Sequence, residues 1–251
     1  MGLKIISGNI FTSKCQTIVN TVNCVGVMGA GIALECRLRY PEMYKKYMAL
    51  CENNQISIGK LWLYKAGDRW ILNFPTKRHW KYPSKIEYLN SGLRKFVDTY
   101  ESKAITSIAF PLLGADKGGL NPDASLKIMK SYLHSLAIDI EIYRYDPESH
   151  DELYCQIHDW LFSQNLDQIS SVTRLRKDYV LRVIDAMKSP SIVQLNQLGH
   201  VKGIGVKTLE KLFATAQQAI RDTDHKDQKP AQLTLDIVEQ RAPADAKKPR
   251  R

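Results

Sequence analysis

Long apolar segments are missing from this 251-residue chain, and so are cysteines spaced in pairs. No apolar run approaches the roughly 20 residues that a membrane-spanning helix needs, and the N-terminus has no signal-peptide pattern. The five cysteines, at positions 15, 24, 36, 51 and 155, are an odd number without metal-ligand spacing. We therefore expect a soluble protein of the reducing cytoplasm, with no metal ion, no cofactor and no membrane partner.

The dinucleotide-binding fingerprint and the P-loop are also missing, but two other glycine-rich loops are present. The first follows an apolar strand and contains Asn20, Asn23 and the run Gly26-Val27-Met28-Gly29-Ala30-Gly31-Ile32. Glycines let backbone N–H groups approach a ligand closely, and such a loop before a helix favours a diphosphate. The two asparagine amides suit ribose hydroxyls. The alternative is a tight strand–helix connection without a ligand.

The second loop also follows a strand and precedes a helix. Its candidate ligand-binding residues are Pro111, Leu113, Gly114, Ala115, Asp116, Lys117, Gly118, Gly119 and Leu120. Because open α/β sheets bind ligands at the carboxyl ends of their strands, we expect a binding crevice between residues 26–33 and 113–120. Lys117 can face a phosphate there, and Asp116 is either a polar participant or a turn residue.

The hydrophobic pattern alternates strands with helices in the first part of the chain. It predicts strands at 4–7, 17–21, 60–64, 70–74, 107–110 and 138–143, and helices at 31–39, 42–53, 85–101, 122–136 and 148–162. This order predicts an α/β domain over residues 1–163. Helical stretches at 171–187, 191–198 and 206–220 predict a small all-α domain over residues 166–220. Residues 221–251, rich in charge and proline, are expected to be a disordered basic tail.

The chain is basic, with a formal net charge of +10. Residues 77–85 contain four basic side chains and three aromatic rings, counting His79, without an acid. Basic groups attract phosphates and rings offer stacking faces for single-stranded nucleic acid. Arg78, His79, Trp80 and Lys81 are therefore candidate nucleic-acid contacts. The alternative is a solvated basic loop whose rings pack on the core.

Taken together, these motifs resemble a macrodomain, the ADP-ribose-binding α/β module, and in particular the DarG-type antitoxin macrodomains. The resemblance covers roughly residues 1–150. It is carried by Asn20-Thr21-Val22-Asn23, by the glycine run up to Ala33, by Arg39–Tyr44 and by Asn73–Trp80. It implies a three-layer α/β/α sandwich with a mixed central sheet. It also implies a glycohydrolase that removes ADP-ribose from DNA bases, as the antidote to a DNA ADP-ribosyltransferase toxin.

Lys77 is the candidate catalytic residue. A lysine crowded by cations, here Arg78, Lys81 and Lys85, sheds its proton more readily. The free amine can then attack the anomeric carbon of the distal ribose and form a Schiff-base-type adduct. The resemblance supports this role, because Lys77 falls where DarG-type enzymes carry their catalytic lysine. An acid-assisting role and an ordinary place in a basic loop remain alternatives.

Two departures from the family pattern bear on function. The family's Gly-Asp-Ile/Leu is Gly8-Asn9-Ile10 here, so Asn9 replaces the aspartate that receives the adenine amino group. Gly118 stands where terminal ADP-ribose glycohydrolases have a catalytic aspartate, so their two-residue mechanism does not carry over. Two other functions stay open: a hydrolase acting on ADP-ribose-1″-phosphate or on ADP-ribosylated protein, and a non-catalytic ADP-ribose reader tethered to DNA.

The helical part contains a hairpin-like motif of its own. The sequence Val201–Leu212 resembles the hairpin of a helix-hairpin-helix DNA-binding motif. Its candidate phosphate contacts are Lys202, Gly203, Gly205 and Lys207. The alternative is a plain glycine-terminated turn. Known DarG proteins carry a larger C-terminal region that blocks the toxin, so direct binding of a toxin is left open.

Overall fold

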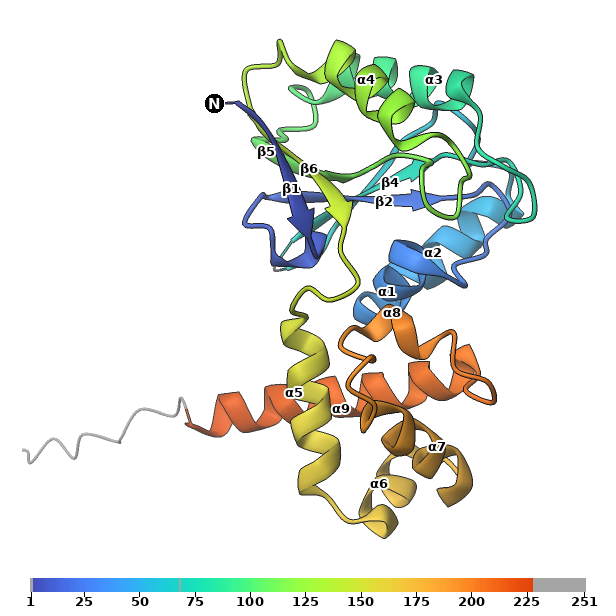
Figure 1. Ribbon diagram of the computed structural model, residues 1–251, viewed down its shortest axis with the longest axis vertical. Helices are drawn as coiled ribbons and strands as arrows, with labels where there is room; N and C mark the ends of the chain where they lie inside the picture. The colour runs from blue at the N-terminus through green and yellow to red at the C-terminus, as the bar shows by residue number, and fades with distance from the viewer. Residues whose placement is uncertain (1, 68, 228–251) are drawn as a thin grey trace, which may run out of the picture.

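The fold is a mixed sheet with helices on both faces and a helical region attached beside it (Figure 1). The computed structural model describes residues 2–67 and 69–227. Within them the sheet has six strands in the order β1-β6-β5-β2-β4-β3, parallel except for the β3–β4 pair. The strands are β1 (Leu3–Gly8), β2 (Thr17–Val22), β3 (Trp62–Lys65), β4 (Trp70–Pro75), β5 (Ser107–Pro111) and β6 (Asp139–Tyr145).

Helices cover the two faces of the sheet in pairs. Helices α3 (Ile86–Thr99) and α4 (Pro122–Leu133) pack on one face, and α1 (Gly31–Arg39) and α2 (Pro41–Glu52) pack on the other (Figure 1). Each face has its own apolar core, and the central strand β2 contributes Val19 to one core and Ile18 to the other. The three-layer α/β/α sandwich with a mixed sheet is thus confirmed.

Proline and asparagine set two helix boundaries that matter for the site. Pro41 occupies the first turn of α2, where its missing N–H costs nothing, and it disfavours helical geometry at Tyr40, where α1 ends. Asn121 caps α4 by accepting from the amides of Asp123 and Ala124, directly before Pro122. Both boundaries agree with the sequence prediction to within one residue.

The helical region consists of α5 (Glu152–Ser163), α6 (Leu166–Thr173), α7 (Lys177–Met187), α8 (Leu195–Leu198) and α9 (Val206–Asp227). Its apolar core includes Leu34 and Leu38 of α1, so α1 faces the sheet on one side and the helical region on the other. Gly199 permits this approach, because a Cβ there would lie 2.4 Å from Leu34 Cδ2.

Helix α5 packs in the core of the helical region rather than against the sheet. We therefore propose a domain boundary just after β6 in place of the expected boundary at residue 163. The shared core also means that removing residues 166–251 would expose Leu34 and Leu38 to water.

Several predicted bounds need correction. The expected helix at 171–187 is two helices, because Arg174 adopts a left-handed conformation with φ of 52° that ends α6. Helix α5 begins at Glu152 rather than 148, after Asp151 as its cap. A short 3-10 helix, Ile10–Thr12, had not been expected. Helix α9 continues through Asp227, so residues 221–227 of the expected tail are helical, and residues 228–251 lie outside the described residues.

Among the described residues, none of the helices combines the length and the apolar character that crossing a membrane requires.

Candidate functional site

Three loops meet at the carboxyl edge of the central strands. We call them the first glycine loop (23–30, after β2), the basic loop (76–85, after β4) and the second glycine loop (112–121, after β5). The first glycine loop and the basic loop continue the strand pairing: the amide of Cys24 donates to the carbonyl of Arg78 at 3.2 Å. The amide of Ser84 donates to the carbonyl of Gly118 at 2.9 Å, which joins the basic loop to the second glycine loop. The three loops therefore form one connected surface.

Asn23 shapes the first glycine loop from within. Its side-chain oxygen accepts from the amides of Val25 and Val27, and its Nδ2 donates to the carbonyl of Val27 at 2.5 Å. Tyr47 of α2 donates to the Asn23 carbonyl at 2.7 Å. Since its amide is committed to the loop and is 7% exposed, Asn23 holds the loop in shape rather than facing a ribose.

Asn20 lies deeper than expected. It is fully buried, and its Nδ2 donates to Asn73 Oδ1 on the neighbouring strand β4 at 2.9 Å. Its own side-chain oxygen has no hydrogen-bond partner. The expected contact between Asn20 and ribose hydroxyls is therefore not available in this arrangement, and Asn20 instead braces β2 against β4 below the loops.

The N-terminus of α1, which is half-exposed, begins where the first glycine loop ends. Ala30, its cap residue, supplies no side-chain hydrogen bond, and the first turn has no acidic residue. Gly29 and Ala30 are exposed. The first amides of a helix have no partner inside the helix, and the helix dipole adds positive potential there. This end of α1 is therefore suited to an anionic group.

The second glycine loop is folded tightly on itself and lies over the start of α1. A Cβ at Gly118 would be 2.2 Å from the carbonyl oxygen of Gly114, so no side chain fits at position 118. Gly114 and Gly119 have positive φ values of 68° and 74°. A Cβ at Gly31 would lie 3.7 Å from Asp116 Oδ2, which shows how close the two glycine loops come.

Lys77 joins the basic loop to the second glycine loop. Its amine donates to the backbone carbonyl of Lys117. Burial, rather than the expected crowding by Arg78, Lys81 and Lys85, lowers the pKa of Lys77 below its usual value. The nearby negative charge of Asp116 opposes this shift. The structure thus brings Lys77, Asp116 and Lys117 together, with Asp116 and Lys117 beside the start of α1.

Asn9 and Ile10 lie at the end of β1, away from this meeting point. Asn9 caps the short 3-10 helix, since its side-chain oxygen accepts from the amide of Phe11 at 3.0 Å, and its Nδ2 donates to the carbonyl of His150 at 3.4 Å. Both residues are buried, Asn9 at 4% exposure and Ile10 at 7%. The amide of Asn9 is thus held by the protein itself.

The aromatic side chains of the basic loop face solvent. Trp80 is 49% and Tyr82 66% exposed. The His79 ring stacks on Trp80 with centroids 5.6 Å apart, and the Lys81 amine lies 5.2 Å from the Trp80 ring centre. The alternative, that these rings pack on the core, is therefore wrong for Trp80 and Tyr82. An exposed ring cluster with cations around it is suited to stacking with bases.

Tyr145 is a candidate that the sequence analysis missed. It ends β6, two residues beyond the Tyr143–Pro111 pair, and therefore lies at the same edge as the second glycine loop. Tyr145 is 51% exposed. Burial raises its pKa, and the charges of Glu35 and, to a smaller extent, Asp116 act in the same direction. The sequence did not indicate Tyr145, because the residues after β6 contain no glycine loop or other recognisable binding motif.

Cys24 and Cys36 are not placed as nucleophiles. Burial raises the pKa of Cys24 to about 11 and that of Cys36 well above its usual value. Both thiols therefore stay protonated at neutral pH, which agrees with a packing role. Among the described residues, no group of three or more His, Cys, Asp or Glu side chains is placed to hold a metal ion.

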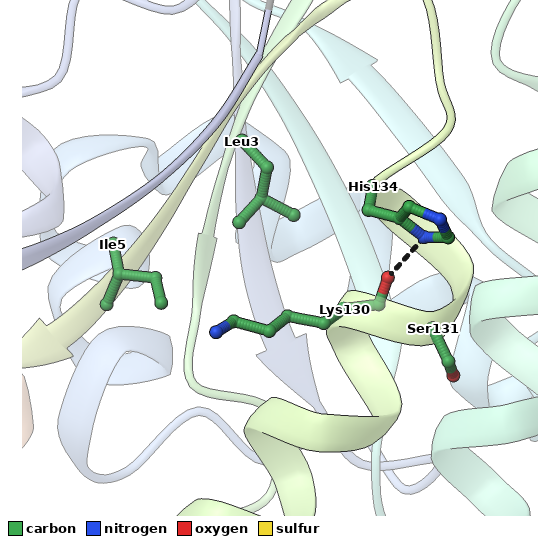
Figure 2. A pocket seen from close by; sticks show the side chains of 5 residues that line it. All are labelled: Leu3, Ile5, Lys130, Ser131 and His134. Carbon is green, nitrogen blue, oxygen red and sulfur yellow. Dashed lines mark hydrogen bonds between the residues drawn. The ribbon is translucent and has the colours of Figure 1, made fainter.

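Two cavities lie outside the three loops. Figure 2 shows a shallow one at the outer strand, where Lys130 of α4 extends beneath Leu3 and Ile5 of β1 and His134 contacts the Lys130 carbonyl. It is mostly apolar and contains none of the candidate residues. The other, of about 570 Å³, lies between Asn9, the end of α1, and helices α5 and α9. Asn9 is the candidate residue that lines it.

The hairpin residues lie in the helical region, between α8 and α9. Gly203 has a φ of 87°, and Gly205 precedes α9 with open space around it. Lys202 and Lys207 are exposed. Farther along α9, Glu210 pairs with Arg37 of α1 at 2.7 Å, and Arg37 also donates to the carbonyl of Met28 in the first glycine loop. The start of α9, which follows the hairpin, is therefore linked through Arg37 to the first glycine loop.

The family model, the related sequences and the related structures all point to the same family. The family model described as "Macro domain" matches residues 19–129. A "DNA ADP-ribosyl glycohydrolase" of Thermus aquaticus is 39% identical over 150 residues, which are 58% of this chain and 41% of that protein. The solved structure "Macrodomain of Thermus aquaticus DarG" is 37% identical with a TM-score of 0.54, covering 57% of this chain and 97% of that one.

A second relative comes from Thermosipho africanus. A "DNA ADP-ribosyl transferase-DNA ADP-ribosyl glycohydrolase fusion protein" is 36% identical over 160 residues, 56% of this chain and 41% of that protein. The structure "Thermosipho africanus DarTG in complex with ADP-ribose" is 36% identical with a TM-score of 0.56, covering 60% of this chain and 43% of that one. The chain thus spans about two-fifths of the length of these curated relatives.

Proposed function

Because the chain belongs to the macro domain family, we propose that it is a DNA ADP-ribosyl glycohydrolase, a hydrolase that removes ADP-ribose from DNA bases. The observation that carries this proposal is the position of the Lys77 amine. It lies where the basic loop meets the second glycine loop, beside the uncapped start of α1. The choice of substrate is supported by the relatives from Thermus aquaticus and Thermosipho africanus, whose names both contain "DNA ADP-ribosyl glycohydrolase".

The uncapped N-terminus of α1 and the second glycine loop are the proposed diphosphate site. The exposed residues Gly29 and Ala30 lead into the first turn of α1, whose amides have no side-chain cap and supply hydrogen-bond donors. Lys117 adds a positive charge from the opposite loop. The structure "DarTG in complex with ADP-ribose" makes ADP-ribose the appropriate ligand to test. A diphosphate bound between the start of α1 and the second glycine loop would orient the distal ribose toward Lys77.

Lys77 is the proposed nucleophile. Its free amine attacks the anomeric carbon, a carbon–nitrogen bond to Lys77 forms, and the glycosidic bond to the base breaks. The base nitrogen leaves with the bonding electrons and takes up a proton. One water then hydrolyses the Schiff-base-type adduct, which releases ADP-ribose and returns Lys77. The lowered pKa of Lys77 increases the fraction of free amine at neutral pH.

The exposed basic loop and the hairpin are the proposed nucleic-acid contacts. Trp80 and the stacked His79 offer faces to bases, while Arg78 and Lys81 attract phosphates. In the hairpin, the amides at Gly203 and Gly205 and the exposed Lys202 and Lys207 form a helix-hairpin-helix-like phosphate contact. A cognate DNA ADP-ribosyltransferase toxin is the proposed source of the substrate, as the transferase part of the fusion relative suggests.

Release of ADP-ribose from a modified single-stranded oligonucleotide tests this function directly. The same assay with ADP-ribosylated protein and with ADP-ribose-1″-phosphate separates the substrate classes, and the Lys77→Ala variant is the control. We expect release from the oligonucleotide alone, and none with the variant. ADP-ribose binding without release from any substrate would instead favour a non-catalytic reader and would contradict the proposal.

A further inference from the structure

A hydrogen bond to the helical region holds an aromatic side chain, Tyr145, at the edge of the second glycine loop. The hydroxyl of Tyr145, at the end of β6, donates to Asn196 Oδ1 of α8 at 3.1 Å. Asn196 is 7% exposed, whereas half of the Tyr145 ring surface faces solvent. The hydroxyl is therefore anchored in the helical region, while about half of the Tyr145 surface stays exposed at the strand end that borders the second glycine loop.

A buried network fixes the orientation of the Asn196 amide. Its Nδ2 donates to Glu35 Oε2 of α1 at 3.0 Å, and a carboxylate can only accept. The amide oxygen must therefore point the other way, toward the Tyr145 hydroxyl. Glu35 is held in turn by Arg39, whose guanidinium also pairs with Asp151 at 2.6 Å. Asp151 accepts from the amide of Leu195 in α8 at 3.1 Å. The Asn196 Nδ2 also donates to Gln194 Oε1 at 3.3 Å, so the amide nitrogen faces acceptors only and the amide oxygen faces the donor.

We propose that Asn196 is a positioning residue that fixes the Tyr145 ring beside the ADP-ribose site, so that the helical region contributes to ligand affinity without touching the ligand. The inference rests on the proposed function for the identity of the ligand. A tethered ring loses less conformational freedom when a ligand packs against it, and preorganisation of this kind increases affinity. One hydrogen bond links Tyr145 to Asn196, and the orientation of the Asn196 amide maintains it.

The test is a double-mutant cycle on ADP-ribose affinity in the full chain. Tyr145→Phe removes the hydroxyl and keeps the ring, and Asn196→Ala removes its acceptor. We expect each to weaken binding about three- to tenfold, the equivalent of one hydrogen bond. The double variant should bind no more weakly than either single one, because both remove the same interaction. In the release assay, the same variants should increase KM more than they lower kcat.

Gln217→Ala is the matched control, because it removes a hydrogen bond from α9 to the Leu38 carbonyl at the same interface but away from Tyr145. Its ADP-ribose affinity should equal that of the wild type. Additive losses in the cycle, or loss with Asn196→Ala but not with Tyr145→Phe, would overturn the inference. Unchanged affinity in all variants would overturn it as well. A wild type that binds ADP-ribose but releases none from DNA would contradict only the proposed function.

Discussion

The side-chain amine of Lys77 donates a hydrogen bond to the backbone carbonyl of Lys117, which joins two loops that follow different strands. Lys77 follows β4 and Lys117 follows β5, and β2 lies between these strands in the sheet. The bond therefore links two loops at the edge of the sheet where β2 leads into the first glycine loop. Asp116, whose charge acts on the amine, lies beside the start of α1.

Replacing Lys77 by arginine should abolish turnover almost as fully as replacing it by alanine. Arginine keeps the positive charge but stays protonated in a protein, so it cannot attack the anomeric carbon. Single-turnover release of ADP-ribose from a modified oligonucleotide measures this, and borohydride trapping of the wild-type adduct provides an independent readout. If Lys77→Arg retained most of the rate, the lysine would act through its charge and the nucleophilic role would be wrong.

Asp116→Asn should shift the rising limb of the pH–rate profile toward lower pH. Asp116 raises the pKa of Lys77 against the larger lowering effect of burial, so removing its charge lowers that pKa further. More of the amine is then free at a given pH, and the reaction reaches its plateau earlier. The profile of kcat, measured between pH 6 and pH 10 with saturating substrate, shows the shift as a change of midpoint. A shift toward higher pH would contradict this placement of the two charges.

The sequence predicted the order of elements well, because strands and amphipathic helices alternate and Pro41 and Asn121 mark helix boundaries clearly. It also placed Lys77, Asp116 and Lys117 at one edge of the sheet, since carboxyl ends of parallel strands meet there. It could not show that Asn23 and Asn20 are committed to internal hydrogen bonds, because an amide followed by a glycine loop looks the same whether it faces a ligand or its own backbone.

The interface of the helical region could not be read from the sequence either. In this interface Leu34 of α1 packs against residues more than 100 positions later in the chain. Neither Leu34 nor the residues that it contacts belong to a recognisable motif. The break at Arg174 was missed for a local reason: a left-handed residue that is not glycine leaves the apolar periodicity unbroken. Asn196 and Tyr145 were missed because their significance lies in a single long-range hydrogen bond.

Gly29→Val should abolish ADP-ribose binding while the protein stays folded. The position has no positive φ and a Cβ there would meet only Val27 at 3.8 Å, so the loop tolerates the side chain. The added methyl groups would cover the uncapped end of α1 and keep a diphosphate away from its amides. Gly67→Val is the matched control, in a turn with open space around it. Calorimetry that found equal affinities for the two variants would place the diphosphate elsewhere.

Arg39→Met should destabilise the protein by about 3 kcal/mol or more, because it leaves the carboxylates of Glu35 and Asp151 buried without a cation. The loss should grow with pH. Burial already raises the pKa of Glu35 in the folded chain, and Arg39 opposes that effect, so the variant raises it further. A carboxyl with a raised folded-state pKa stabilises the fold below its unfolded-state pKa and loses this contribution as pH rises. Urea unfolding at pH 5 and pH 8 measures the difference, and equal losses at both would contradict it.

Lys202→Ala combined with Lys207→Ala should weaken binding to unmodified DNA and reduce the salt dependence of that binding. Each lost phosphate contact lowers the log–log salt slope by roughly one unit, so we expect a change of about two. Lys95→Ala with Lys103→Ala removes the same charge from exposed positions in α3 and the turn that follows it, on the opposite side of the sheet from the helical region (Figure 1). That control should change the slope little. If both double variants changed it equally, net charge rather than the hairpin would account for binding, and the helix-hairpin-helix-like contact would be wrong.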